Sequence, residues 1–233
     1  MSTFLQLVNI ARQEAGVASN DLTTLQGTLS TETNRFKNWI GREWLRVQAD
    51  KPDWQFMRRS SQFTLTASKY LYSPTEVGAA ATPAFTAATF GNWKRDSFRI
   101  YSTDYTDEML AGFMPWETFR NVYQYGSMRN SLSRPVAFSV APDKSLAFGI
   151  TPDLGYGVVF EYYTAPLALS ADGDTPTMPA QFHDLIVYRA LRAYGVFMAA
   201  PEVLQRADME IARIHPKLLA DQLPVFLSGP PLA

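Results

Sequence analysis

Two histidines, His183 and His215, are the side chains best suited to proton transfer or metal binding, because cysteine is absent. They lie 32 positions apart (215 minus 183), and neither belongs to an H-E-x-x-H motif, so their spacing predicts no metal site. His183 precedes Asp184 in the first turn of a predicted helix, where we expect a surface or capping role. His215 precedes Pro216, and we expect an exposed histidine at a helix end.

A second candidate is the carboxylate pair Asp172 and Asp174, which suggests either a Ca²⁺ site or acid–base chemistry. The segment lacks the later ligands of an EF-hand loop, so a solvated turn is favoured over a calcium site. A pair of general-acid carboxylates that cleaves a cell-wall glycan stays open, since the two partners can be distant in the chain. Gly155 and Gly157 lack the third glycine of a dinucleotide-binding loop, and no P-loop occurs. The sequence therefore predicts no catalytic residue, no cofactor-binding residue and no metal ligand.

Two clusters combine basic and aromatic side chains, a composition that can bind single-stranded nucleic acid by stacking. The first contains Lys51, Trp54, Phe56, Arg58 and Arg59, and the second contains Trp93, Lys94, Arg95 and Arg99. Acidic neighbours at Asp50, Asp53 and Asp96 neutralise much of this basic charge. Packing, or pairing between subunits, is therefore favoured over DNA binding for both clusters.

Length and composition predict one sizeable core or two small ones: the chain has 233 residues, of which 46% are apolar and 13% aromatic. The formal net charge of −1 argues against tight, sequence-specific DNA binding and suits a wall past which DNA slides. The absence of cysteine excludes disulfides and fits folding in a reducing cytoplasm. No apolar run approaches the ~18–20 residues of a membrane span, and no basic residue precedes the apolar segment Phe4–Ala11, so neither a membrane partner nor a signal peptide is expected.

Apolar residues at helical spacing predict helices near both ends of the chain. The expected helices are Phe4–Ala15, closed by Gly16, then Thr31–Asp50, Phe182–Ala199, and a last helix that starts at Pro201 and that Pro216 kinks or ends early. Their apolar stripes need a common partner, so we expect burial of Trp39, Ile40, Phe182, Ile186 and Phe197. After Asp221 the sequence QLPVFLSGPPLA predicts an extended arm, because its prolines exclude a helix or a central strand.

The middle of the chain shifts toward the period of two that is typical of β-strands. The expected elements are a hairpin of Gln62–Thr66 with Lys69–Tyr72, an exposed loop or weak strand at Gly78–Phe90, a strand at Ser97–Tyr101, a short helix from Pro115 to Gly126, a second hairpin of Val136–Val140 with Ser145–Ile150, and a strand at Val158–Tyr163 that closes the sheet. The expected fold class is α+β: an antiparallel helical bundle formed by both chain ends, with an inserted antiparallel β-rich domain and an extended C-terminal arm. The expected boundaries are residues 1–59 and 171–220 for the helical layer, 60–170 for the β-rich insertion and 221–233 for the arm.

The order of several weak motifs carries a resemblance to a known family. A strand that ends in EYY is followed by a proline, by the D-x-D-x-P loop of residues 172–176, and by P-x-x-F-H at residues 179–183. Further motifs are FLQLVNIARQEAG, NWIGREWLRVQADKPDWQFMRRS, WKRDSFRIY, FSVAPDKSLAFG and ADQLP. In this order the motifs resemble the head-to-tail adaptor proteins of tailed bacteriophages, over most of the chain from Phe4 to about Pro224.

This resemblance implies a structural protein of the virion neck that is not an enzyme, is made in the host cytoplasm and needs no cofactor. The implied partners are the portal ring, a tail or nozzle protein below, other copies of the chain in a ring of twelve, and double-stranded DNA that passes through the lumen without sequence-specific binding. In such adaptors the C-terminal segment reaches the portal, which implies portal binding by Leu223, Pro224, Val225, Phe226 and Leu227. The alternatives are a head-completion or tail-tube protein, a cell-wall-degrading virion enzyme and, for the arm, folding back over its own helices.

Overall fold

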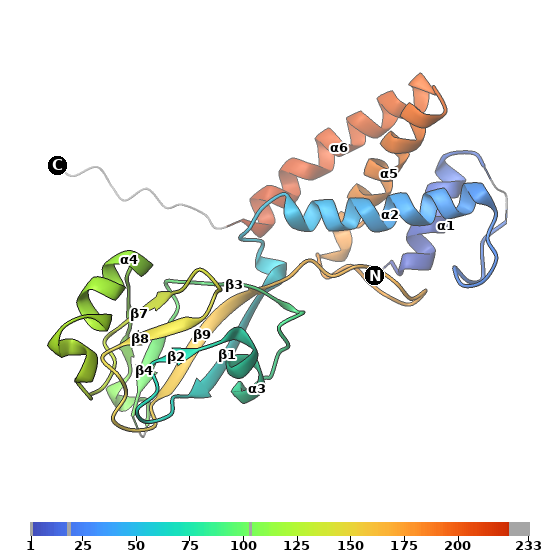
Figure 1. The fold of residues 1–233 in the computed structure, drawn as a ribbon. Helices are drawn as coiled ribbons and strands as arrows, with labels where there is room; N and C mark the ends of the chain where they lie inside the picture. Colours follow the sequence, from blue (N-terminus) through green and yellow to red (C-terminus); the bar gives the residue numbers. More distant parts are fainter. Residues whose placement is uncertain (1, 18–19, 103, 224–233) are drawn as a thin grey trace, which may run out of the picture. The chain divides into compact units, whose positions relative to one another are not determined.

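The computed structural model describes residues 2–17, 20–102 and 104–223, which form six α-helices and two β-sheets (Figure 1). The chain divides into two compact units. We call them the helical unit (residues 1–57 and 166–233) and the β unit (residues 58–165). The fold is therefore α+β, as predicted, with the β-rich segment inserted in the sequence between two helical segments.

Four helices build the helical unit: α1 (Phe4–Glu14), α2 (Thr31–Ala49), α5 (Asp184–Phe197) and α6 (Pro201–Gln222). A capping box starts α1, because the Thr3 hydroxyl accepts from the backbone N of Gln6 at 3.3 Å and the Gln6 side chain accepts from the backbone N of Thr3 at 2.9 Å. Gly16 follows α1 with φ at +69°, the left-handed conformation of a helix-ending glycine. All four predicted helices are thus present, close to their predicted bounds.

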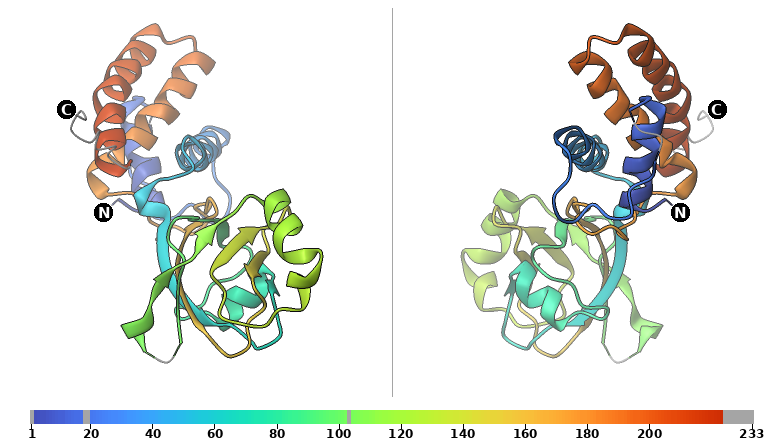
Figure 2. Two further views of the ribbon diagram at one scale, coloured as in Figure 1. Left: turned by 90° about the vertical axis from the view of Figure 1, so that its left-hand side faces the viewer. Right: turned by 90° about the vertical axis from the view of Figure 1, so that its right-hand side faces the viewer.

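The helix α5 is central to the helical unit, because α1, α2 and α6 all pack against it (Figure 2). Three of the residues predicted to be buried are buried: Ile40, Phe182 and Ile186. The prediction is wrong for Phe197, whose side chain is 52% exposed, and Trp39 is only partly buried. Val196 is 68% exposed as well, so the last turn of α5 extends beyond the core.

Of the two predicted effects of Pro216, a kink or an early end of the helix, the early end is wrong, because α6 continues through Pro216 to Gln222. A proline inside a helix lacks the backbone N–H, and its ring crowds the carbonyl group four residues earlier, here that of Ala212. Both residues are exposed, so water can solvate the carbonyl that loses its partner. The buried Ile214 and Leu218 on the other face hold the helix on the core.

Two sheets build the β unit. The first contains β1 (Arg58–Thr64), β9 (Gly157–Thr164), β3 (Phe90–Trp93), β4 (Arg99–Tyr101) and β5 (Met109–Leu110). The second contains β2 (Leu71–Tyr72), β8 (Leu146–Gly149), β7 (Ala137–Val140) and β6 (Gly112–Phe113). Among the described strands the pairs are antiparallel, except that β6 and β7 are parallel. The strand β9 pairs with β1, β3 and β4, so the strand expected to close the sheet lies in its middle instead.

One predicted hairpin is confirmed and the other is wrong. The strands β7 and β8 pair antiparallel, as predicted. The segments of the first predicted hairpin separate, because β1 pairs with β9 in one sheet and β2 pairs with β8 in the other. A side chain stabilises the connection between β1 and β2, because the Tyr72 hydroxyl accepts a hydrogen bond from the backbone N of Thr66 at 2.8 Å. A period of two in the sequence predicts strands but not their partners.

The prediction of an exposed loop or weak strand at Gly78–Phe90 is confirmed in part: residues 82–89 lie outside the named helices and strands and, apart from Phe85, are exposed, but the segment also contributes to the core of the β unit. Its start belongs to the helix α3 (Pro74–Ala80). Phe85 and Phe90 are buried, and the ring centroid of Phe85 lies 4.4 Å from that of Tyr162 in β9. Two phenylalanines among many alanines and threonines therefore supply enough apolar surface to fix the segment.

Aromatic side chains fill the space between the two sheets of the β unit. The ring centroid of Phe98 lies 4.2 Å from that of Phe138 in β7 and 5.5 Å from that of Phe160 in β9. All three rings are fully buried, so Phe98 joins the two sheets. The helix α4 (Trp116–Phe119) packs against β7, begins after Pro115 as predicted, and continues into one π-helical turn.

Candidate functional site

His183 is buried, with an exposed fraction of 1%, so the prediction of a surface or capping role is wrong. The backbone N of Ser2 donates to its Nδ1 at 3.2 Å, which leaves the ring proton on Nε2, 3.1 Å from the carbonyl oxygen of Met178. Burial is the main cause that lowers the pKa of His183 and favours the neutral ring. This imidazole ties the start of the chain to the segment before α5, and both of its nitrogens are used in doing so.

The carboxylates predicted to lie in a solvated turn are acceptors in a hydrogen-bonded loop. Asp172 accepts from the Thr24 hydroxyl at 2.5 Å and from the backbone N of Leu25 at 2.9 Å. Asp174 accepts from the backbone N of Ser170 at 2.7 Å. These hydrogen bonds lower the pKa of both carboxyl groups, so each is an ionised acceptor and not a proton donor. The turn is present, and its carboxylates have a structural role.

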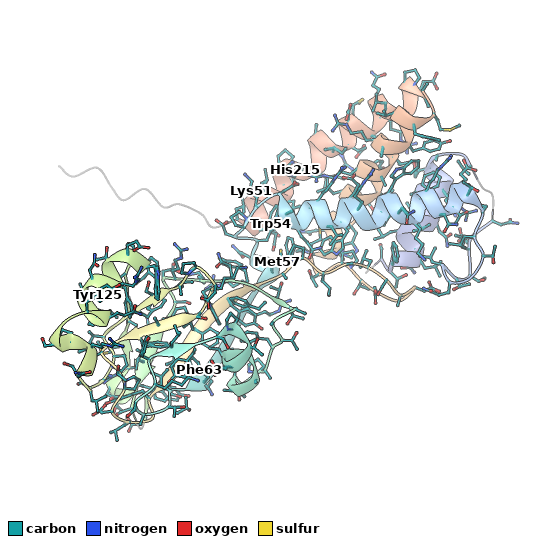
Figure 3. All side chains as sticks on the ribbon, in the orientation of Figure 1. Lys51, Trp54, Met57, Phe63, Tyr125 and His215 are labelled. Atoms are coloured by element: carbon teal, nitrogen blue, oxygen red, sulfur yellow. The ribbon has the colours of Figure 1, made fainter. Side chains whose placement is uncertain are left out.

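His215 lies inside α6, so the prediction of an exposed histidine at a helix end is also wrong. Its Nε2 atom is buried and has no hydrogen-bond partner among the described residues. Burial, followed by the positive charges of Arg189 and Lys51, lowers the pKa of His215 (Figure 3). Within the described ranges no three His, Asp or Glu side chains lie close enough to hold a metal ion.

The aromatic members of the two basic clusters are packed inside the protein. Trp54 and Trp93 are 0% and 2% exposed, and the indole N–H of each donates to a backbone carbonyl oxygen. Lys94 pairs with Asp96 at 2.6 Å, one of the acidic neighbours expected to neutralise the clusters. Buried rings cannot stack on nucleic-acid bases, so the structure favours the packing interpretation.

A groove in the helical unit is a candidate contact site, with a volume of about 810 Å³. It lies on α5 between α2 and α6, which both pack against α5 but not closely against each other. Its apolar lining consists of Trp39, Ala193, Val196, Phe197 and Ile211. Its polar lining consists of Arg42, Glu43, Arg46, Arg189, Arg192 and His215. We call this site the arginine groove.

Guanidinium groups outnumber carboxylates in the arginine groove. The Nε of Arg42 lies 3.7 Å and an Nη of Arg46 lies 2.5 Å from the same carboxylate oxygen of Glu43, whose side chain is nearly buried. The other two arginines pair with acids outside the lining, Arg189 with Asp50 at 2.7 Å and Arg192 with Asp208 at 2.9 Å. Four guanidinium groups therefore share three carboxylates, which leaves the groove with an excess of positive charge.

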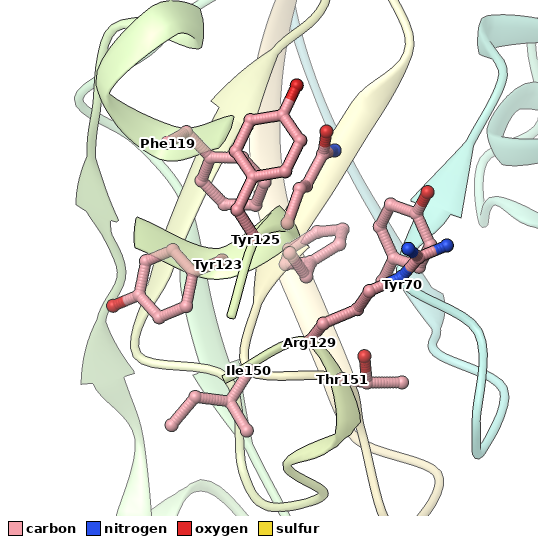
Figure 4. Close-up of a pocket in the computed structure, with 9 residues that line it drawn as sticks. Tyr70, Phe119, Tyr123, Tyr125, Arg129, Ile150 and Thr151 are labelled. Atoms are coloured by element: carbon pink, nitrogen blue, oxygen red, sulfur yellow. The ribbon is translucent and has the colours of Figure 1, made fainter. Parts of the chain in front are cut away.

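A smaller pocket of about 180 Å³ lies in the β unit, where the segment after α4 covers the second sheet (Figure 4). Its lining is mostly aromatic and consists of Tyr70, Phe119, Tyr123, Gln124, Tyr125, Arg129, Phe148, Ile150 and Thr151. Arg120 holds the ring of Tyr125, one of the lining residues, by donating a hydrogen bond to its hydroxyl at 2.5 Å. The described lining residues include no carboxylate and no histidine, and the aromatic rings give the pocket a large apolar contact area.

The described residues thus line two candidate contact surfaces, the arginine groove and the aromatic pocket. The family model of the SU10 adaptor protein matches residues 2–221, which is nearly the whole chain. The chain belongs to the SU10 adaptor protein family. A comparison with individually curated proteins gave no match.

Membership of the SU10 adaptor family confirms the resemblance found in the sequence and makes this protein a structural adaptor of a bacteriophage. The family is one of structural adaptors and not of enzymes, and it implies a place in the virion neck with portal and tail components as partners. In the part of the chain that the structure describes, each helix is too short or too polar to cross a lipid bilayer.

The SU10 family match ends at residue 221, just before the residues predicted to bind the portal. Leu223, the first of them, follows α6 and is half-buried, and its backbone N donates to the carbonyl oxygen of Leu219 at 3.1 Å. The other predicted portal-binding residues, Pro224, Val225, Phe226 and Leu227, lie outside the described residues. Their assignment stays a prediction.

Sequence reasoning missed the arginine groove of this SU10 adaptor, although a signal for it exists. Arg42 and Arg46 are four residues apart on α2, and Arg189 and Arg192 are three residues apart on α5. Such spacing places each pair on one face of its helix. Only the packing of α2 on α5 brings the two faces to one groove.

Proposed function

We propose that this SU10-family protein is the head-to-tail adaptor of a tailed phage, and that its copies form a ring on the portal. The ring has twelve copies, continues the DNA channel of the portal and presents its other side to the tail or nozzle protein. The family match over residues 2–221 carries this proposal. A head-to-tail contact between copies closes into a ring when its rotation fits the number of subunits.

Exposed apolar side chains support extensive contacts with other proteins. In the helical unit these include Leu167, Met198 and Met209, with exposed fractions between 50% and 66%. In the β unit they include Tyr105, Leu110, Leu132 and Leu154, with exposed fractions between 56% and 61%. Where such side chains gather into a contiguous patch, the patch is typical of a protein-binding surface, and the neighbouring subunits of a ring would cover it.

The charge of the chain supports a passive DNA channel. With a formal net charge of −1, the protein lacks the excess of basic residues that neutralises phosphates and holds DNA in place. DNA can then slide along the lumen during packaging and ejection without sequence-specific binding.

We further propose that residues 223–227 attach the adaptor to the portal. Four of these five residues are apolar (Leu223, Val225, Phe226 and Leu227), which suits an anchor for a neighbouring protein surface. Pro224 restricts the backbone before binding and so reduces the entropy lost on docking.

The test is binding of the purified chain to purified portal rings of the same phage, followed by co-sedimentation and negative-stain electron microscopy. The full chain should join the portal as a ring of matching symmetry. A chain that ends at Gln222 should keep its circular dichroism spectrum and thermal transition but lose attachment. A chain that lacks only residues 230–233 is the matched control and should still attach.

The two proposals fail in different ways. If the full chain does not join portal rings but does join tail tubes, it is another component of the neck and the adaptor proposal is wrong. If the chain that ends at Gln222 joins portal rings normally, the adaptor proposal holds and the assignment of residues 223–227 is wrong.

A further inference from the structure

The apolar side of the arginine groove is held in place although it faces water. The ring centroids of Trp39 and Phe197 lie 5.9 Å apart, and the guanidinium carbon of Arg35 lies 4.3 Å from the centroid of the Phe197 ring. Trp39 also contacts Tyr194, at 6.1 Å between centroids. Phe197 is nevertheless 52% exposed, and Val196 beside it is 68% exposed. Large apolar side chains that are ordered by their neighbours and left in water are typical of a protein-binding surface.

The charged side of the groove is able to reach a ligand. The side chains of Arg42, Arg46 and Arg192 are 51%, 56% and 60% exposed. Two of them share one oxygen of Glu43, so neither makes the two parallel hydrogen bonds of a bidentate pair with it. A carboxylate from a partner would give a guanidinium group an acceptor of its own.

The helix α6 lines one side of the arginine groove and contributes a polar atom that has no hydrogen-bond partner among the described residues. The Nε2 of His215 lies among the residues of the groove, is buried, and has no hydrogen-bond partner among the described residues. A buried polar atom without a partner is unfavourable, and native structures contain few of them. A polar group of a ligand that enters beside α6 would satisfy it.

We propose that the arginine groove binds an acidic amphipathic helix of a partner protein. The apolar face of that helix packs on Trp39, Val196 and Phe197, and its carboxylates pair with Arg42 and Arg46. A helix is the segment that fits, because α2 and α6 both lie on α5 and leave between them the place where a further helix completes the packing. The proposal goes beyond the ring and the portal contact described above and depends on neither.

Charge complementarity decides between the possible occupants. A basic helix would meet an excess of guanidinium groups and be repelled. Nucleic acid would satisfy the arginines, but its phosphates would leave the apolar surface of Trp39, Val196 and Phe197 without a partner. An acidic amphipathic helix matches both halves of the groove.

The test uses two synthetic helical peptides that carry leucine at positions i, i+3, i+4 and i+7 and differ only in their polar residues, glutamate in one and lysine in the other. Binding of each dye-labelled peptide to the full chain is measured by fluorescence anisotropy. The glutamate peptide should bind at least about tenfold more tightly than the lysine peptide, and its affinity should fall as salt is added.

Charge changes at single exposed residues locate the binding site without disturbing the core. Val196→Glu places a carboxylate in the groove and should weaken binding of the glutamate peptide about tenfold, whereas Val196→Lys should preserve it. Met209→Glu is the matched control, because Met209 is exposed on α6 to a similar degree, 66% against 68%, but does not line the groove. Thermal melts of the three variants should coincide with that of the unaltered chain.

Four outcomes would overturn the proposal. Equal affinities for the two peptides would remove the charge argument, and an equal effect of Val196→Glu and Met209→Glu would place the peptide elsewhere. Displacement of the glutamate peptide by duplex DNA, more readily than by unlabelled peptide, would make the groove a nucleic-acid site. Self-association of the chain that Val196→Glu abolishes in the absence of peptide would make the occupant a second copy.

Discussion

The carboxylate of Asp172 binds the hydroxyl of Thr24, at 2.5 Å, although the two residues are 148 positions apart in the chain. The same carboxylate accepts from the backbone N of Leu25, whose side chain is buried. The backbone N of Phe4 donates to the carbonyl oxygen of Asp174 at 2.7 Å, close by in the same loop. The loop that precedes α5 therefore holds both the start of α1 and the connection between α1 and α2.

Replacing Asp172 by alanine should lower the melting temperature of the helical unit, because the backbone N of Leu25 and the hydroxyl of Thr24 lose their acceptor. The hydrogen bonds to Thr24 and Leu25 lower the pKa of this carboxyl group in the folded state. The unfolded chain therefore takes up the proton first as pH falls, and the stabilisation present above about pH 4 is lost below it. Melting curves from pH 7 to pH 3 check this.

The matched control for Asp172 is Asp221→Ala, since Asp221 is exposed near the end of α6 and, among the described residues, accepts only from its neighbour Gln222. This variant should melt like the unaltered chain. If Asp172→Ala and Asp221→Ala have the same melting temperature at pH 7, the loop does not depend on its carboxylate.

Stability should also fall between about pH 6.5 and pH 5, because burial lowers the pKa of His183 below its ordinary value of about 6.5. Protonation then favours the unfolded chain, so the contribution of the neutral ring is lost as pH falls below the unfolded pKa. Urea unfolding at pH 7 and at pH 5 should show a smaller difference for His183→Gln than for the unaltered chain. His215→Gln, at the other histidine with a lowered pKa, separates the two contributions. An unchanged pH dependence in both variants would refute this assignment.

Ile186→Ala should destabilise the helical unit by about 2–5 kcal/mol, the usual range for removing a large buried aliphatic side chain. Ile186 is fully buried on α5, the helix against which the other three pack. Val196→Ala, on the exposed last turn of the same helix, should change the free energy of unfolding by less than about 0.5 kcal/mol. Denaturant unfolding measures both, and equal values would contradict the central position of Ile186.

Two glycine-to-alanine changes should have effects of opposite sign on the free energy of unfolding. A Cβ at Gly41, inside α2, would meet no atom within 4 Å, so Gly41→Ala should stabilise the protein by about 0.5–1 kcal/mol through lower backbone entropy of the unfolded chain. A Cβ at Gly78, inside α3, would lie 2.3 Å from the carbonyl oxygen of Phe85. Gly78→Ala should therefore destabilise it by about 1–3 kcal/mol, as overpacking does. Thermal and urea unfolding decide, and stabilisation by both changes would show that α3 moves freely away from Phe85.

Local signals in the sequence were enough to predict the long helices and several of the strands, but not α3, β5 or β6. The apolar spacing of Phe36, Ile40 and Val47 predicts α2, and Gly16 and Pro201 mark the end of α1 and the start of α6, because these signals act within a few residues of where they stand. The hairpin of β7 and β8 was equally predictable, since its strands are neighbours in the chain. The order of weak motifs was also enough to predict the family that the match over residues 2–221 shows.

The partners that these elements take depend on long-range packing, which local signals do not reveal. Ser2 reaches His183 from 181 positions away and makes a predicted surface histidine a buried one. The strand β9 lies in the middle of its sheet because β1, β3 and β4 come to it from earlier in the chain. The arginine groove exists because α2 and α6 both settle on α5. Local periodicity depends on backbone geometry over a few residues. These arrangements depend instead on burial between segments that are far apart in the sequence, and a local pattern does not show which of those segments contact each other.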